Sequence, residues 1–215
     1  YLIIDMSGGE GIMPLSEQVP NELRGSSDGT FKVFIVEVRQ DDRGTQVVVS
    51  RSHPGLVFKL FQMEVPEIVN GQVSIMAIAR EPGQRCKIAV ASNDQRIDPI
   101  GACVGGRGDR VKRVVTELRG EKIDIVTYNE DKRSMIINAM SPAKVSDVII
   151  SEDGTQADVI VPDFQLSLAI GRAGINAKLA AQLCGLRLDV KSESEAAGLT
   201  VENTAAPVSD GGANA

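Results

Sequence analysis

The sequence predicts an α+β fold in which a strand-rich segment precedes two copies of one helix–loop–helix–strand module. The copies run over residues 100–126 and 166–191, and each has a Gly-x-x-Gly loop, an amphipathic helix, a further Gly and a strand containing Asp. One such loop means little in a chain with 21 glycines, but two with matched surroundings indicate a duplication. The matched positions are Gly105 and Gly171, Gly108 and Gly174, Gly120 and Gly185, and Asp124 and Asp189. The offset changes from 66 to 65 residues, which predicts a one-residue difference within the second helix.

Residues 1–51 are predicted to form the strand-rich segment. β-branched and alternating residues mark strands at 1–6, 31–38 and 46–50, with turn-forming clusters between them. The pattern resembles an oligonucleotide-binding (OB) barrel, which needs five strands where only three or four are present, so we expect a truncated OB-type β-barrel. On a regular strand Phe31 and Phe34 would face opposite sides, which leaves one ring free to stack on a base.

Residues 52–128 are expected to form the first module. His53 is the only histidine and fits a linker residue or a helix cap better than a catalytic group. A short helix with one apolar face follows it, and then a hairpin of residues 73–79 and 86–91 around a Pro-Gly turn. The first Gly-x-x-Gly unit and a strand at 122–127 complete the module.

Residues 129–192 repeat this order as a second module. After it the composition shifts to Ala, Gly, Ser, Glu and Asn, so residues 193–215 are predicted to be a disordered tail. Within the second module, a helix is expected at residues 132–140, a hairpin at 145–150 and 157–161, a helix ending at Ile170, and a closing strand at 186–191.

The net charge of −6 argues against nucleic-acid binding through bulk positive charge. The charge is uneven, however, because residues 104–122 and residues 165–191 each carry a local excess of three positive charges. The three cysteines are far apart and form no C-x-x-C motif, so neither a disulfide framework nor a zinc site is expected. The sequence has no apolar run of membrane-spanning length and no signal peptide, which predicts a cytoplasmic protein without membrane contact.

Each Gly-x-x-Gly loop has the features that a phosphate-binding loop needs. Glycine lets another backbone approach closely, and the N-terminus of the following helix favours an anion. The middle residues Gly106-Arg107 and Arg172-Ala173 add one guanidinium to each loop. This combination resembles the KH module, whose GxxG loop binds about four nucleotides while their bases lie in an apolar groove. The α-β-β-α-α-β order is that of the prokaryotic-type (type II) KH fold, and a helical corner without a ligand is the alternative.

The predicted RNA contacts lie in the two loops and just after them. Arg110 and Arg113 share a face of the helix that follows the first loop. Asp109 is expected to cap that helix, and Asn176 either reads a base edge or caps a helix. The full RNA-binding set is Gly105, Gly106, Arg107, Gly108, Arg110, Arg113, Gly171, Arg172, Ala173, Gly174, Asn176 and Lys178, with Ile100, Val104, Leu168 and Ile170 supporting unstacked bases.

No arrangement of residues in the sequence predicts catalysis. There is no P-loop, and no carboxylate pair, His–Cys pair or Ser–His–Asp set is recognisably placed. We therefore expect a non-enzyme with no catalytic residue, no cofactor and no bound metal.

Nearly all of residues 1–194 resembles the NusA family of bacterial transcription elongation and termination factors. The resemblance is carried by SRSHPGLVFKLFQMEVPEI, REPGQRCKIAVASND, DPIGACVGGRGDRV, LRGEKIDIV, NAMSPAKV and VPDFQLSLAIGRAGINAKLAAQL. It implies a monomer that binds single-stranded RNA, either a nascent transcript or a leader, and modulates pausing, termination and antitermination.

The same resemblance implies two further kinds of partner, RNA polymerase and other antitermination factors. The polymerase is expected to bind mainly through an N-terminal domain of the family that has no counterpart in this sequence. Three residues depart from the family pattern and affect the expected base preference. Ala173 replaces a residue that is often polar or charged, Ile175 replaces a glutamine, and Leu186 replaces a tryptophan.

Three other functions are compatible with the sequence. An accessory RNA-binding module of an exoribonuclease would share parts of this chain, but an OB barrel placed before two prokaryotic-type KH modules counts against it. A protein-interaction scaffold with non-binding KH folds is favoured by the acidic net charge. An enzyme is the least favoured alternative.

Overall fold

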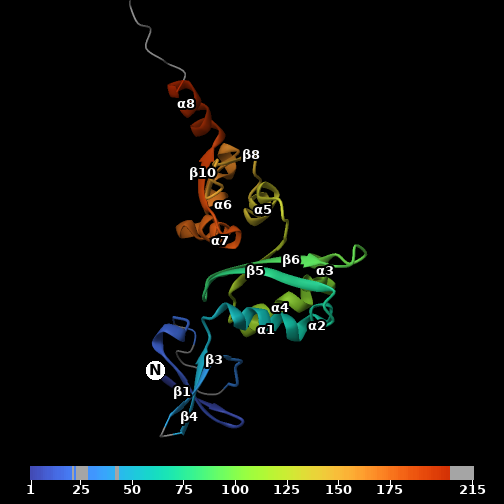
Figure 1. The fold of residues 1–215 in the computed structure, drawn as a ribbon, viewed down its shortest axis with the longest axis vertical. Coiled ribbons are helices and arrows are strands. Elements are labelled where there is room, and N and C mark those ends of the chain that lie inside the picture. Colours follow the sequence, from blue (N-terminus) through green and yellow to red (C-terminus); the bar gives the residue numbers. More distant parts are fainter. Residues whose placement is uncertain (21, 23–28, 42–43, 204–215) are drawn as a thin grey trace, which may run out of the picture.

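The computed structural model describes residues 1–20, 22, 29–41 and 44–203, and it has an elongated α+β architecture with three β-sheets (Figure 1). A four-stranded N-terminal sheet lies at one end, and two three-stranded sheets with their helices follow it along the long axis. The predicted α+β class with a repeated module is confirmed. None of the described helices combines the length and the apolar character needed to cross a membrane.

The N-terminal sheet is open and does not close into a barrel over the described residues. Its order is β1-β2-β4-β3, in which β1–β2 and β3–β4 are antiparallel and β2–β4 is parallel. Closure would require pairing between the edge strands β1 and β3, which the sheet lacks. The expected truncated barrel is therefore an open sheet. Its strands are β1 (Leu2–Met6), β2 (Gly9–Met13), β3 (Phe34–Asp41) and β4 (Gly44–Ser50).

Phe31 and Phe34 do not lie on one strand as predicted, because β3 begins at Phe34. The Phe31 ring lies beneath the guanidinium of Arg51, 5.7 Å from its central carbon. The Phe34 ring stacks on His53 with their centroids 4.6 Å apart. Side chains alternate between faces only within a strand, so the prediction of opposite faces does not apply to this pair. Both rings contact side chains of the protein itself.

The first module begins with a helix that His53 caps, since Nδ1 of His53 accepts a hydrogen bond from the Gly55 N–H at 2.9 Å. Its sheet has the order β5-β6-β7, with β5–β6 antiparallel and β6–β7 parallel. The elements are α1 (Pro54–Glu64), α2 (Pro66–Val69), β5 (Val73–Glu81), β6 (Arg85–Ser92), α3 (Pro99–Val104), α4 (Asp109–Glu117) and β7 (Lys122–Thr127).

The second module repeats the mixed pairing, with the order β10-β9-β8, β8–β9 antiparallel and β9–β10 parallel. Its first helix is capped by Asp131, whose carboxylate accepts the Ser134 N–H at 2.9 Å. The elements are α5 (Lys132–Ala139), β8 (Asp147–Ile150), β9 (Gln156–Val161), α6 (Leu166–Ile170), α7 (Ile175–Cys184) and β10 (Arg187–Ser192).

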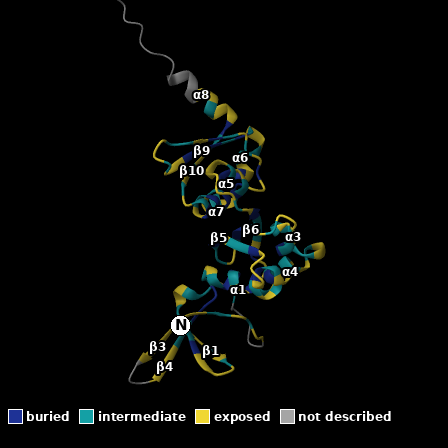
Figure 2. Ribbon diagram, turned by 45° about the vertical axis from the view of Figure 1, so that its right-hand side comes forward, coloured by how far each residue is buried: buried dark blue, intermediate teal, exposed yellow. Residues whose placement is uncertain are grey.

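The sheet of the first module lies between two hydrophobic clusters, and it shares one of them with the second module. Cys86, Ile88 and Val90 of β6 face the cluster formed with α1, α3 and α4. Ala89 of the same strand is fully buried in the other cluster, together with residues of α5 and α7. Buried segments meet where β6 approaches α7 (Figure 2). The sheet of the first module is therefore the middle layer between two sets of helices.

Polar contacts also join the modules, including a bond at 2.9 Å from Nδ2 of Asn138 on α5 to the carbonyl of Thr127 at the end of β7. The fully buried Lys87 of β6 donates from Nζ to the carbonyl of Ser141, just after α5, at 2.6 Å. At the surface, Nζ of Lys178 on α7 lies 2.6 Å from a carboxylate oxygen of Glu81 at the end of β5. With the shared core, these contacts hold the KH-like modules in a fixed relative position.

The one-residue difference between the modules lies in the turn after the helix and not within the helix as predicted. Arg119 and Gly185 both follow their helices in the left-handed region, at φ 56° and 66°, so the offset of 66 persists to this point. Gly120, at φ 93°, is the extra residue. The predicted match of Gly120 with Gly185 was wrong because an arginine takes the backbone state that glycine usually takes.

Residues 193–203 form helix α8 (Glu193–Asn203), so a disordered tail is wrong for this part; residues 204–215 lie outside the described residues. A capping box begins the helix, since the Ser192 side chain accepts the Glu195 N–H at 3.2 Å and the Glu195 carboxylate accepts the Ser192 N–H at 2.8 Å. Composition alone conceals this Ser-x-x-Glu signal.

Candidate nucleic-acid interface

The two Gly-x-x-Gly loops have the same backbone geometry. Their first glycines have φ, ψ of 76°, 174° and 77°, 169°, and their third residues, Arg107 and Ala173, have 57°, 20° and 53°, 27°. Each loop forms a 3-10 turn between two helices: α3 and α4 in the first module, α6 and α7 in the second. The duplication inferred from sequence therefore extends to individual dihedral angles.

Glycine is required at the first position of each loop for two reasons. Both residues have positive φ, and a Cβ on Gly105 would lie 2.5 Å from a carboxylate oxygen of Asp109. A Cβ on Gly171 would lie 2.9 Å from the backbone nitrogen of Asn176. The chain thus brings each loop close against the first turn of the next helix, which other residues would prevent.

The N-termini of α4 and α7 lack side-chain caps. Gly108 and Gly174 occupy the cap positions, and neither helix has a side-chain hydrogen bond there. Asp109 was predicted to cap α4, but it is the first helical residue and accepts instead from Arg113 at 3.3 Å. The first N–H groups of each helix, with its positive dipole end, therefore remain suited to an anion.

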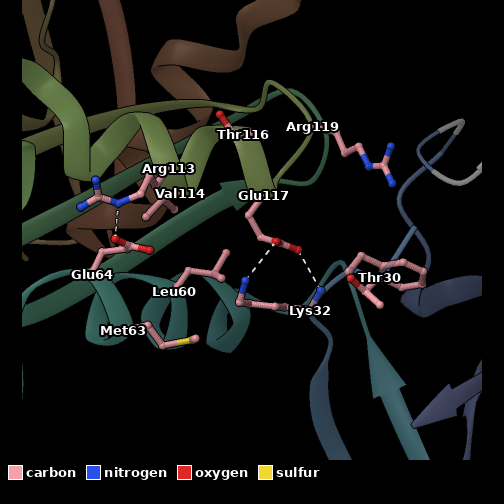
Figure 3. Close-up of a pocket in the computed structure, with 11 residues that line it drawn as sticks. Thr30, Lys32, Leu60, Met63, Glu64, Arg113, Val114, Thr116, Glu117 and Arg119 are labelled. Atoms are coloured by element: carbon pink, nitrogen blue, oxygen red, sulfur yellow. Dashed lines mark hydrogen bonds and ion pairs between the residues drawn. The ribbon is translucent and has the colours of Figure 1, made fainter. Parts of the chain in front are cut away.

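The predicted cations of the first module divide into one free and two paired side chains. Arg107 is exposed at the tip of the loop and makes no ion pair within the described part of the chain. Arg110 bonds to Glu67 at 2.9 Å and to the carbonyl of Ala102 at 2.6 Å. Arg113 bonds to Glu64 at 2.5 Å, at the side of a pocket that Figure 3 shows. Arg107 is thus the cation best placed to meet a phosphate.

The second module shows a similar division. Arg172 and Ala173 are exposed in the loop, and Arg172 has no ion pair among the described residues. Asn176 is only 1% exposed, and its Nδ2 donates to the carbonyls of Ala169 and Met140 at 2.9 and 3.2 Å. Asn176 therefore fixes the loop to α5 and α6, a role that sequence could not separate from base reading. Lys178 joins the modules through Glu81, as described above.

Sequence reasoning missed two residues beside the second loop. A pocket of about 530 Å³ lies between this loop and the β5–β6 turn of the first module, lined on one side by Arg85 and Lys122 and on the other by Gly171 and Arg172. Arg85 is held by two bonds to Asp124 at 2.7 and 2.9 Å, while Lys122 is exposed. No local motif marks them, because only the packing of the modules brings them to the loop.

The cysteine thiols near this interface are unsuited to nucleophilic chemistry. Burial raises the pKa of Cys86 to about 12, and burial raises the pKa of Cys103, in the last turn of α3, to about 11. Thiols with such values stay protonated at neutral pH. The interface offers cations, helix N-termini and exposed apolar side chains such as Leu168 and Ile170, which suit binding of a polyanion.

Comparison with known proteins identifies the family. Residues 51–128 match a family model described as a NusA-like first KH domain, and residues 132–198 match a NusA-like second KH domain. Both matches include a Gly-x-x-Gly loop in the geometry described above. The prediction of two tandem KH domains is thereby confirmed.

Relatives named transcription termination/antitermination protein NusA align over most of the chain. The protein from Halalkalibacterium halodurans is 49% identical over 91% of this chain and 51% of its own length. Those from Bacillus subtilis and Mycobacterium bovis are each 48% identical, over 91% and 86% of this chain and 53% of their own lengths. The chain thus spans about half the length of these relatives. From its two KH domains and these identities, the chain belongs to the NusA family.

Proposed function

We propose that this chain is the RNA-holding part of a transcription factor that acts with RNA polymerase on pausing, termination and antitermination. It would bind single-stranded RNA, from a nascent transcript or a leader, along both KH domains. The names of its relatives support the role in termination and antitermination. Family membership favours this function over an exoribonuclease module or a scaffold with inactive KH folds.

The observation that carries the proposal is the pocket between the second loop and the first KH domain. It combines the glycine loop of one domain with Lys122 and Arg85 of the other, so an RNA strand there would touch both domains at once. Arg85 is pre-oriented by Asp124, which reduces the entropy lost when it binds a phosphate. The strand would pass from the first loop, at Arg107, to the second.

The fixed position of the two domains supports the same proposal. The shared core and the Lys178–Glu81 and Lys87–Ser141 contacts leave little freedom between the loops. Once one loop holds RNA, the other therefore sees a high effective concentration of the same strand. We propose a domain division into residues 1–51, 52–128 and 129–192, a monomer in the cytoplasm, and a binding protein rather than an enzyme.

The test is a fluorescence-anisotropy titration with a labelled, unstructured RNA of roughly eight nucleotides, about four for each domain. One variant carries Gly106→Asp with Arg107→Asp, and another carries Arg172→Asp with Ala173→Asp. Asp tolerates the left-handed backbone at positions 107 and 173, so the loops should keep their shape. Each variant should lose roughly 1 kcal/mol or more of RNA affinity, because carboxylates repel phosphate.

A charge-matched control carries Arg39→Asp with Gln40→Asp on β3, in the N-terminal sheet away from both loops (Figure 1). This control should bind the same RNA like the wild type. For the wild type, the logarithm of affinity should fall linearly with the logarithm of salt concentration. Folded loop variants that bind as tightly as the wild type would refute the proposal.

A further inference from the structure

A second pocket lies outside the KH loops, at the junction of the N-terminal sheet and the first KH domain. It has a volume of about 430 Å³ and opens between α1, the end of α4 and residues 30–32 (Figure 3). Leu60 and Val114 form its apolar floor, and Met63, a residue that is 65% exposed, stands at its rim. We call it the α1–α4 pocket; its volume is in the range of small-molecule and nucleotide sites.

The charges in the α1–α4 pocket favour an anionic ligand. Its two carboxylates already have cationic partners: Glu64 accepts from Arg113 at 2.5 Å, and Glu117 accepts from Arg51 at 3.0 Å. Lys32 adds a backbone bond of 2.8 Å and a side-chain bond of 3.3 Å to Glu117. Within the described part of the chain, the side chain of Arg119 has neither an ion pair nor a hydrogen bond.

The backbone at Arg119 sets this residue apart. Its φ of 56° is left-handed, and the matching residue of the second KH domain is Gly185, at φ 66°. The fold accepts glycine here, so the arginine places a long cation at a cost in backbone strain. Figure 3 shows its side chain projecting from the end of α4 toward the segment that carries Thr30 and Lys32. Because the second domain has no side chain at this position, the feature is particular to the first domain.

We propose that the α1–α4 pocket binds one nucleotide of single-stranded RNA, with a phosphate on Arg119 and the base over Met63 and the apolar floor. This inference rests on the proposed function, because it extends the RNA path beyond the first loop. Helix α4 leads from that loop to the pocket, and its nine residues span about 14 Å. A few nucleotides of extended RNA cover this distance.

The test compares a short RNA, roughly eight nucleotides that cover only the two loops, with RNAs extended by several nucleotides at the 5′ or the 3′ end. The main variant is Arg119→Gly, which copies the second domain and relieves the left-handed backbone, so its thermal midpoint should not fall. Arg119→Lys keeps the charge, and Met63→Ser removes the apolar rim from an exposed position. Arg39→Gln, on β3, is the control for loss of an exposed arginine.

Wild-type protein should bind one of the extended RNAs more tightly than the short RNA. Arg119→Gly should leave the affinity for the short RNA unchanged and lower the affinity for the extended RNA roughly fivefold. The slope of the logarithm of that affinity against the logarithm of salt concentration should become smaller by about 0.7. Arg119→Lys should keep most of the wild-type affinity for the extended RNA. Met63→Ser should lower the affinity for the extended RNA and leave that for the short RNA unchanged.

The proposal is overturned if Arg119→Gly binds the extended RNA with wild-type affinity and salt slope, or if extension adds nothing to wild-type binding. In both cases continued binding of the short RNA would leave the proposed function intact. If the wild type binds neither RNA, the proposed function fails together with the pocket.

Discussion

The Gly-x-x-Gly loops of the two KH domains have nearly the same backbone dihedral angles, yet the central strands of the two domains are buried in different ways. In β6 of the first domain, residues 86–90 are all buried, because helices cover both faces of the sheet. In β9 of the second domain, burial alternates, and only Ala157, Val159 and Val161 are buried. The same fold therefore serves once as a middle layer and once as an end layer.

This difference determines where charged side chains have to be neutralised. Lys87 faces the second domain and is fully buried, whereas Asp158, at the matching position of β9, is 45% exposed. The first domain also buries Arg80 and Glu121 as an ion pair, where the second has the apolar Leu186 at the Glu121 position. A middle layer leaves its polar groups no access to water, so each needs a partner within the protein.

Breaking the buried Arg80–Glu121 pair should give the largest effect. Each side chain is 1% exposed, and they are joined at 2.8 and 2.9 Å in a bidentate arrangement. Glu121→Leu, which copies the second domain, leaves a buried guanidinium without its carboxylate. We expect a loss of about 3–5 kcal/mol in the free energy of unfolding, measured by urea denaturation.

The double variant Arg80→Leu with Glu121→Leu tests whether the stability lost in Glu121→Leu comes from the unpaired charge of Arg80 or from poorer packing. It should recover much of the lost stability, because apolar residues often replace a buried ion pair at little cost. A double variant less stable than Glu121→Leu alone would show that the bond from Arg80 to the carbonyl of His53, at 3.0 Å, dominates instead.

Asp124 of the first domain and Asp189 of the second should differ in how they affect stability in acid. Burial disfavours the Asp124 carboxylate, but hydrogen bonds from Arg85 and Lys87 outweigh it and hold the pKa of Asp124 below its ordinary value of 3.8. A lowered folded-state pKa stabilises the fold above pH 3.8, and this stability is lost as the pH falls through the lowered value. Asp124→Asn should cost about 2 kcal/mol near neutral pH and flatten the acid side of the stability profile.

The matched control is Asp189→Asn. Its carboxylate is 68% exposed and contacts Lys191 at 3.1 Å, so its removal should change stability by about 0.5 kcal/mol or less. The measurement for both is urea unfolding at a series of pH values between about 2 and 7. Equal flattening by the two variants would contradict the assignment of the acid dependence to Asp124.

The sequence was sufficient to predict features that depend on local spacing. The two loops follow from glycine pairs between helical stretches, and the cap at His53 follows from its position before Pro54. The Ser192-to-Glu195 capping box is equally local, so α8 was readable in principle, although the tail composition concealed it.

Features made by docking of the modules were beyond local reasoning. Arg85 and Lys122 reach the second loop only because α5 and α7 pack on the outer face of the first sheet. The burial of Asn176 comes instead from packing within the second domain, because both of its acceptors, Ala169 and Met140, belong to that domain. Arg119 was missed for another reason: the glycine pattern drew attention to Gly120 and away from the left-handed residue before it.

The smallest predicted effects on stability concern the third residue of each loop, where the first loop has an arginine and the second an alanine. Arg107 and Ala173 both lie at positive φ, so Arg107→Gly and Ala173→Gly should each raise the free energy of unfolding by about 0.5–1 kcal/mol in urea denaturation. Only Arg107→Gly removes a guanidinium, so it alone should weaken RNA binding in the anisotropy titration. If Ala173→Gly weakened RNA binding as much, the rigid left-handed backbone, and not the cation, would be what each loop contributes to holding RNA.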